Sequence, residues 1–344
     1  MENQKITVLL CINGEKGNNK PVLDRQLTAI KYALESEGIE YTFNYDKHYD
    51  LVHLLNLNQY KAYQSVRKNR KANPDAPVVL SLFNDYNDFE NINYSKAIQG
   101  VDYAKAVSKM FSNIGSDVKV VLCNWESQKI LLKHSDVNIH STVVNPGIKT
   151  YYPYDYSKEE IGAFRKYYRV TDEKKIVIGY GEYDYEKGFD ELESIARIMP
   201  DYEFFYFGGK AGLLSNSHHY GKTNKIKNLH YYPHLHRELY HSAIFSATAL
   251  FIPYKFHVDS YMIMEMMKAN VPVVSAKNPY LYDLLIDGKT ALLGENVEDF
   301  YKRLKNIEKE NFAEKAKAFI DEFTIKNYGE NLREVYLNLL RRDV

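Results

Sequence analysis

The sequence is poor in cysteine and tryptophan, and neither sign of charge is in excess. Its 344 residues include 2 cysteines and 1 tryptophan, which excludes a small scaffold held together by several disulfides. Lys plus Arg and Asp plus Glu number 45 each, so no overall electric field draws the chain to nucleic acid. Cys11 and Cys123 end apolar, strand-like runs, and we expect them to be buried free thiols of a reducing compartment.

The signatures of several common protein classes are missing as well. The chain contains no P-loop, no His-Glu-x-x-His and no Gly-x-Ser-x-Gly, which excludes the common NTPases, zincins and serine hydrolases. Six histidines fall between residues 218 and 241 without a cysteine or carboxylate framework, so we expect surface and loop histidines and no metal site. No apolar run approaches the roughly 18 residues of a membrane span and no signal peptide is evident, which predicts a cytoplasmic protein.

The composition of the chain and the alternation of strand and helix patterns along it are those of a two-domain α/β protein. Hydrophobic residues make up 45% and charged residues 26%, the balance of a globular chain, and 344 residues are too many for one ordinary core. Short apolar runs alternate with helical patterns, which predicts doubly wound parallel sheets. The predicted strands are Ile6–Cys11, Glu40–Asn44, Asp50–Leu55, Val78–Leu82, Lys119–Cys123, Thr142–Val144, Lys175–Gly179, Tyr202–Phe207, Leu229–Tyr232, Leu250–Ile252 and Val271–Val274.

The stretch between residues 247 and 274 carries the strongest functional signal. The apolar run Leu250–Ile252 stops at Pro253, as a strand buried on both faces does, and an apolar helical pattern covers Met262–Ala269. A loop between a parallel strand and a helix N-terminus is where open α/β sheets bind anionic ligands. Glu265 lies early in that helix, so we expect its carboxylate to reach hydroxyl groups of the same ligand.

This stretch resembles the nucleotide-sugar half of the retaining GT-B glycosyltransferases of group 1. The continuation, residues 282–293, is similar to an Asp-Gly segment of that family. The resemblance implies α/β, GT-B architecture: two doubly wound Rossmann-like domains with a cleft between them. One departure is His257, which stands where the family has the first of two glutamates. The positions in register are Pro253, Glu265, Met267, Pro272, Val273 and Val274.

The segment after the strand Lys175–Gly179 resembles the family's diphosphate-binding motif, Gly-Arg, four residues, Lys-Gly. Cations are needed there because the charge of the leaving diphosphate must be neutralised. Lys187 and Gly188 match the motif, whereas Glu182 replaces its Arg. The alternative for Lys187 is a solvated lysine at a helix start.

The resemblance also assigns roles around the helix that follows Pro253. Glu265 is expected to accept hydrogen bonds from the donor ribose, and His257 to donate one to the transferred sugar or its phosphate; we take both as the catalytic residues. Backbone N–H groups at the helix start would meet the phosphates, although Asp259 has helix capping as an equal alternative. The positions at that start are Asp259, Ser260, Tyr261 and Met262.

In the first half of the chain the resemblance is weaker. The family's glycine-rich loop, which contacts the donor phosphates, is reduced to Gly14 and Gly17. The next helix, with Arg25 and Gln26, is similar to a Gly-Arg-x-x-x-His-Gln segment of glycolipid synthases, so Gly14 and Arg25 are expected to be donor-binding. Phe83 stands near the position where many members carry a His.

Two functions are left open by these residues. The first is a metal-independent hexosyltransferase, without a cofactor, that moves a hexose from a nucleotide diphosphate sugar, expected to be a UDP-sugar, to a hydroxyl of a lipid or glycan. If the acceptor is a lipid, it implies peripheral contact with the inner face of the membrane through the basic residues between 61 and 71, for which an ordinary solvated face is the alternative. The second, favoured by Glu182, His257, Phe83 and the reduced glycine loop, is a non-catalytic partner subunit of an active glycosyltransferase. The expected domains are 1–150 on the acceptor side, 151–322 on the nucleotide-sugar side, and 323–344 as a helix returning to the first.

Overall fold

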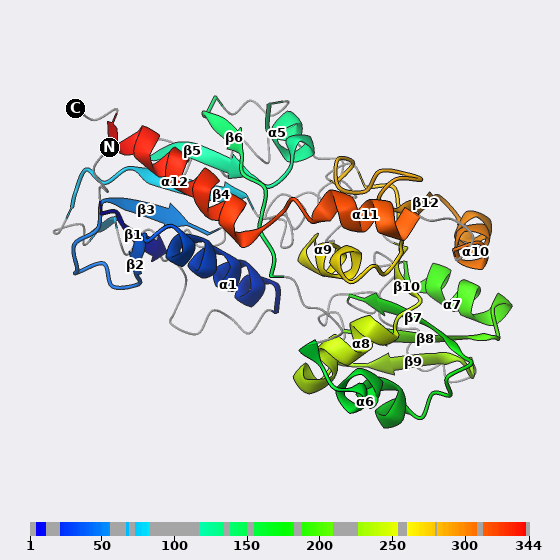
Figure 1. Cartoon of the computed structure of the whole chain (residues 1–344). Coiled ribbons are helices and arrows are strands. Elements are labelled where there is room, and N and C mark those ends of the chain that lie inside the picture. Colours follow the sequence, from blue (N-terminus) through cyan, green and yellow to red (C-terminus); the bar gives the residue numbers. More distant parts are fainter. Residues whose placement is uncertain are drawn as a thin grey trace. The chain divides into compact units, whose positions relative to one another are not determined.

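The computed structural model has two compact units, each built on a six-stranded sheet within the residues that it describes (Figure 1). Unit 1 comprises Met1–Lys149 and Glu322–Val344, and unit 2 comprises Thr150–Asp321. All pairings between named strands are parallel, which confirms the predicted α/β class. The structure describes residues 5–11, 21–55, 67–68, 73–82, 117–133, 138–149, 155–181, 188–208, 226–253, 260–278, 281–307 and 312–341.

The sheet of unit 1 has the strand order β2-β1-β3-β4-β5-β6. The central strands β3 and β4 are buried along their whole length, and their residues are apolar except for His53 and Ser81. Cys11 and Cys123 are buried free thiols, as predicted, and burial raises the pKa of each to about 12. The strands are β1 (Thr7–Cys11), β2 (Glu40–Thr42), β3 (Leu51–Leu54), β4 (Val78–Leu82), β5 (Val118–Cys123) and β6 (Ser141–Val143).

Helix α12, from the far end of the chain, belongs to unit 1 and packs beside α1 (Figure 1). The two helices approach closely at Gly329, where a Cβ atom would collide with the carbonyl oxygen of Ala33. The amide of Ile148 donates to the carbonyl of Phe323 at 3.1 Å. This bond joins the two chain segments of unit 1 where the first ends and the second begins. The described helices of unit 1 are α1 (Pro21–Ser36), α5 (Glu126–Lys133) and α12 (Ile325–Arg341).

A buried hydrogen-bonded histidine ties α12 to the sheet. His53, on β3, is fully buried, with its Nδ1 2.7 Å from the hydroxyl of Tyr336 on α12. Its Nε2 lies 2.6 Å from Oγ of Ser81 on β4. Burial lowers the pKa of His53 to about 3, so the ring is neutral near pH 7. One ring nitrogen therefore donates and the other accepts, and both find a hydroxyl partner.

The sheet of unit 2 has the order β12-β11-β10-β7-β8-β9. Strand β11 begins two residues later than the sequence pattern predicts. The reason is Pro272, which has no N–H to donate to the ladder. Only its carbonyl takes part, accepting from the N–H of Leu250 at 2.9 Å. The short edge strand β12 is one that the pattern did not predict. The strands are β7 (Lys175–Tyr180), β8 (Tyr202–Phe207), β9 (Leu229–Tyr232), β10 (Ala249–Ile252), β11 (Val273–Ala276) and β12 (Leu292–Gly294).

Helices cover this sheet, and the best-capped of them is α6. Ser157 accepts from the N–H of Glu160 while the carboxylate of Glu160 accepts from the N–H of Ser157, a reciprocal capping box. Among the described residues, no helix has both the length and the apolar character to cross a membrane. The helices of unit 2 are α6 (Lys158–Tyr168), α7 (Phe189–Ile198), the 3₁₀ turn η6 (Arg237–Leu239), α8 (Tyr240–Ser246), α9 (Ser260–Lys268), α10 (Val297–Lys305) and α11 (Phe312–Ile320).

The His53 network predicts a specific loss of stability in acid. Because the folded pKa is about 3 and an unfolded histidine has a pKa of about 6.5, the unfolded chain binds an extra proton between these values. This contribution to the free energy of unfolding is complete above about pH 6.5 and is lost as the pH falls toward about 3. Urea unfolding at a series of pH values should give a shallower pH dependence for His53→Gln than for the wild type. Parallel curves for the two proteins would contradict the assignment.

Candidate functional site

The candidate site lies at the carboxyl ends of β7 and β10, two neighbouring strands of unit 2. The chain runs from β7 through β8 to β9 and then returns to the other side of β7 as β10. Such a reversal of strand order is the point where open α/β sheets bind their ligands, because the loops after the two strands diverge there. The two loops themselves, residues 182–187 and 254–259, are not among the described residues.

Gly188 and Pro253 anchor these two loops against each other. Gly188 precedes α7 and has a φ of 61°, a left-handed conformation that favours glycine. A Cβ atom at this position would stand 2.7 Å from the carbonyl oxygen of Pro253, the residue directly after β10. The glycine is therefore required both for its conformation and for the space it leaves. The Lys187-Gly188 segment and the Pro253 segment, which the sequence links only by resemblance, meet in space at this contact.

A second close backbone approach occurs at the ends of β7 and β8. Gly181 has a φ of 141° and donates its N–H to the carbonyl of Phe207 at 3.0 Å. A Cβ atom at Gly208 would collide with the carbonyl oxygen of Gly181. The carboxyl edge of the sheet is thus formed by backbone, with glycines at the ends of two neighbouring strands. Ligand sites that contact phosphates use this kind of uncovered backbone.

Helix α9 follows the β10 loop and is buried on nearly every side. Its bounds, Ser260–Lys268, begin two residues before the predicted start at Met262. Every residue of α9 is buried except Glu265, which is half-buried. The hydroxyl of Tyr240, the first residue of α8, donates a hydrogen bond to Oε2 of Glu265 and lies 3.1 Å from Sδ of Met262. The carboxylate therefore has the partner that its apolar surroundings require.

The first three residues of α9 are among those predicted to contact the donor phosphates. These residues, Ser260, Tyr261 and Met262, are only 1%, 2% and 5% exposed. The N–H groups in the first turn of any helix have no acceptor within that helix, and they carry the positive end of its dipole. An anionic group is favoured at this end of any helix, and the phosphate contact of these residues stays a prediction.

Of the remaining predicted site residues, only Arg25 is among the described ones. Arg25 is half-buried on α1 of unit 1. Gly14, Lys187, His257 and Asp259 lie outside the described residues, so their predicted roles stay predictions. Sequence reasoning missed Tyr240, because its separation of 25 residues from Glu265 follows no helix or strand period.

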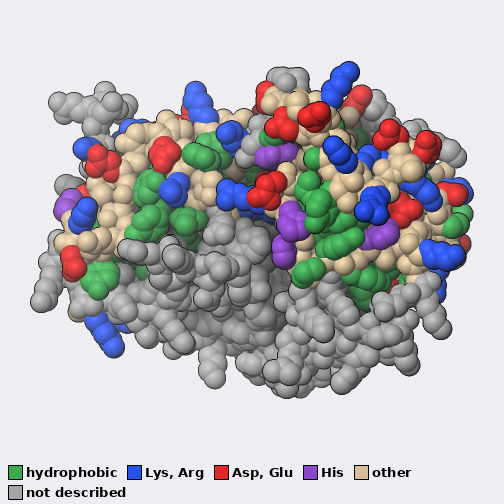
Figure 2. Space-filling model, turned by 90° about the horizontal axis from the view of Figure 1, so that it is seen from below, with side chains coloured by type: hydrophobic (Ala, Val, Ile, Leu, Met, Phe, Trp, Pro, Cys, Tyr) green, Lys and Arg blue, Asp and Glu red, His purple; other side chains and the backbone are tan. Residues whose placement is uncertain are grey.

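The described histidines between residues 218 and 241 do not form a metal site. His230 lies in β9 with its Nε2 2.7 Å from Glu203, and Nδ1 of His241, in α8, lies 2.9 Å from the hydroxyl of Tyr156. These two are therefore not loop residues, which corrects the prediction for them. No group of three His, Cys, Asp or Glu side chains in the described part of the chain could hold a metal ion. On one face of the molecule, histidines lie among hydrophobic and charged side chains (Figure 2).

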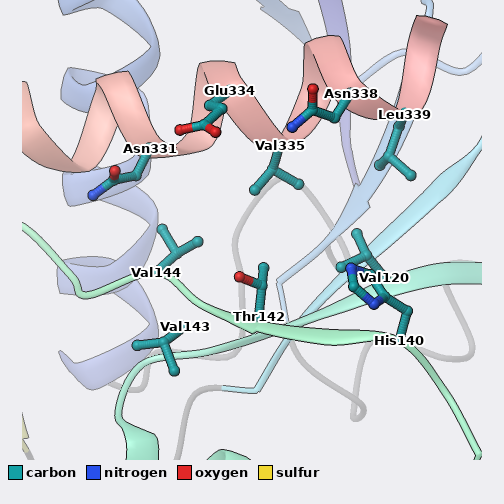
Figure 3. A pocket seen from close by; sticks show the side chains of 10 residues that line it. All are labelled: Val120, His140, Thr142, Val143, Val144, Asn331, Glu334, Val335, Asn338 and Leu339. Atoms are coloured by element: carbon teal, nitrogen blue, oxygen red, sulfur yellow. The ribbon is translucent and has the colours of Figure 1, made fainter. Parts of the chain in front are cut away.

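Two cavities lie elsewhere in the described residues. One, of about 170 Å³, is in unit 1 between α12 and the edge strand β6, and its lining includes Asn331, Glu334 and Asn338 of α12 and Thr142 of β6 (Figure 3). The other, of about 370 Å³, is in unit 2 beside β12 and is lined largely by charged side chains. Neither cavity is lined by the residues that end β7 or begin α9, so neither belongs to the candidate site.

The Asp-Gly segment after β11 supports the edge strand rather than a ligand. Asp287 accepts from the N–H of Leu293 at 2.9 Å and pairs with Arg303 at 3.0 Å. Arg303 also donates to the carbonyl of Leu293 at 3.1 Å. Both backbone groups of an edge-strand residue are thus satisfied by side chains, which protects the edge from pairing with another chain.

Comparison with known proteins identifies a family and a relative of full length. The family model described as Glycosyl transferases group 1 matches residues 161–324. A processive diacylglycerol alpha-glucosyltransferase from Acholeplasma laidlawii is 27% identical over 342 residues, which cover 97% of this chain and 98% of that protein.

Solved structures show the same fold across both units. HepE from Anabaena, in complex with UDP-glucose, has a TM-score of 0.71 and 13% identity, covering 96% of this chain and 99% of that one. WaaG, a glycosyltransferase of lipopolysaccharide biosynthesis, has a TM-score of 0.66 and 15% identity, covering 96% of this chain and 99% of that one. Likeness at this identity establishes the fold, and the predicted GT-B architecture is confirmed.

The contact between Gly188 and Pro253 gives a prediction with a matched control. Gly288 has a similar φ of 70°, but no atom of the described residues lies within 4 Å of the position that a Cβ would take there. Gly288→Ala should therefore cost about 1 kcal/mol in backbone strain alone. Gly188→Ala adds a collision with Pro253 and should cost more than about 2 kcal/mol. Urea unfolding of both variants measures the difference. Equal losses would show that the site tolerates the extra carbon.

The family match, the full-length relative and the topology of both sheets lead to one conclusion. The family match falls on the unit that contains β7, β10 and α9, where the candidate site was located from geometry. Residues 161–324 match the group 1 glycosyltransferases, a family of retaining GT-B enzymes that transfer a sugar from a nucleotide sugar, and both units have the fold of solved GT-B glycosyltransferases.

Proposed function

We propose that the protein transfers a hexose from a UDP-sugar to a hydroxyl group of a diacylglycerol-based lipid, with retention of configuration. The observation that carries this proposal is the relative matched over nearly its whole length, an enzyme named for glucosyl transfer to diacylglycerol. The UDP and glucose held by HepE support a UDP-sugar as the donor. In this proposal unit 2 holds the nucleotide sugar and unit 1 supplies the acceptor side.

The donor would be held at the carboxyl edge of the unit 2 sheet. Lys187 directly precedes Gly188, and the backbone of Gly188 lies against Pro253. In this proposal the ammonium group of Lys187 binds the diphosphate. A single cation there neutralises part of the charge on the leaving diphosphate. The first turn of α9 would add backbone N–H groups, and Glu265 would accept hydrogen bonds from the ribose.

A lipid acceptor implies that the protein meets the membrane surface from one side. The basic residues between 61 and 71 are the proposed contact. Within them Arg67 and Lys68 are described, and both are helical and exposed. The Nε of Arg67 lies 3.2 Å from a carboxylate oxygen of Asp117, so part of its charge is already compensated. Lys68 and its basic neighbours would therefore make the greater contribution to binding anionic lipid.

The proposal is tested by transfer of radiolabelled glucose from UDP-glucose to diacylglycerol in vesicles. Wild-type protein should form a labelled glycolipid and pellet with anionic vesicles. Glu265→Ala removes the proposed ribose contact, and kcat/KM should fall at least roughly tenfold, which corresponds to about 1.4 kcal/mol. Glu314→Ala, on α11 of the same unit, should leave transfer unchanged. Wild-type protein that binds no nucleotide sugar and transfers no glucose would instead favour a non-catalytic subunit.

His257 gives a second test, because it replaces a glutamate of the family. A neutral histidine accepts a hydrogen bond at one nitrogen only and donates at the other, so a pocket adapted to it differs in chemistry from one with a carboxylate. We expect His257→Ala to lower turnover at least roughly tenfold while the affinity for UDP changes little. Steady-state kinetics and calorimetry with UDP separate the two quantities. Unchanged turnover would remove His257 from the site.

A further inference from the structure

We propose that Tyr240 is a positioning residue that fixes the Glu265 carboxylate for recognition of the donor ribose. This inference rests on the proposed role of Glu265. The observation behind it is the hydrogen bond that the Tyr240 hydroxyl donates to Oε2 of Glu265. Met262 lies one turn before Glu265 on α9, and its sulfur is 3.1 Å from the same hydroxyl. One side chain of α8 therefore contacts two residues on the same face of α9.

Tyr240 projects from a helix that is itself firmly attached. The hydroxyl of Ser242 accepts from the N–H of Phe164 at 2.7 Å and donates to the carbonyl of Ile161 at 2.6 Å. His241 lies 2.9 Å from the hydroxyl of Tyr156. These contacts hold α8 to α6 and to the segment before it, so the backbone at Tyr240 is fixed by contacts within unit 2.

The chemistry of the carboxylate explains what this contact would achieve. An ionised carboxylate has two oxygens with about four acceptor positions, and it has no hydrogen to donate. Tyr240 occupies a position on Oε2, which fixes the rotation of the group and so the directions in which its oxygens accept. Recognition of a ribose then costs less ordering of the side chain, which is the usual gain from a preorganised site.

A structural role for the ring alone makes a different prediction. The Tyr240 ring packs against His241, with centroids 5.7 Å apart, and Tyr240→Phe keeps that ring while removing the hydroxyl. If the ring were the important part, this substitution would leave nucleotide recognition unchanged. Tyr156→Phe is the matched control, because it removes another tyrosine hydroxyl from the same attachment of α8 without touching α9.

The experiment compares UDP with 2′,3′-dideoxy-UDP by calorimetry. Wild type should prefer UDP by roughly 10-fold or more, since hydrogen bonds to a charged group are lost with the hydroxyls. Tyr240→Phe should reduce this preference about 3- to 10-fold, and Tyr156→Phe should preserve it. Glu265→Ala should abolish the preference, and adding Tyr240→Phe to that variant should change nothing further, because Tyr240 acts through Glu265.

The outcomes separate this inference from the function on which it rests. Wild-type protein that does not bind UDP would overturn the proposed function and this inference together. Binding of UDP with the same ribose preference in wild type and Tyr240→Phe would overturn the role of Tyr240 alone. An effect of Tyr240→Phe that persists in full in the Glu265→Ala background would also overturn it, because the tyrosine would then act independently of the carboxylate.

Discussion

The candidate site depends on one close approach of backbone to backbone. At Gly188 the chain entering α7 lies against the carbonyl of Pro253, and no residue with a side chain fits there without displacement. The contact joins the residue that follows the loop after β7 to the residue that precedes the loop after β10. Lys187, directly before Gly188, and the start of α9, after the second loop, are the segments proposed to bind the donor.

Much of the fold was predictable from the sequence because buried parallel strands carry no polar face. Strands such as β3, β4 and β10 have every residue buried, and their apolar runs stand out from the polar segments around them. The short strand β12 was not predicted, because three residues give too little pattern. The start of β11 was misplaced because Val271 and Pro272 look like strand residues, whereas a proline cannot donate to the ladder.

The candidate site was predictable only in part, and the reason is geometric. Glu265 stood out because it interrupts an apolar helix, and Gly188 because it ends a recognisable motif. Tyr240 has no such signal, since only the packing of α8 on the same unit brings it to Glu265. Partners of this kind are separated by a variable length of chain, and no local spacing encodes them. Glu265 is the single half-buried residue of α9, and its contact with Tyr240 could be found only from the structure.

The discontinuity of unit 1 also bears on how the protein is made. A ribosome completes residues 1–149 first, yet α12, which covers His53 and packs on α1, emerges only after all of unit 2. Domains generally fold as units during synthesis, and the N-terminal one usually finishes first. Here the order is reversed, because unit 2 is continuous and is the first to have all of its residues. Every residue of unit 2 is therefore synthesised before the helix that completes the packing of unit 1.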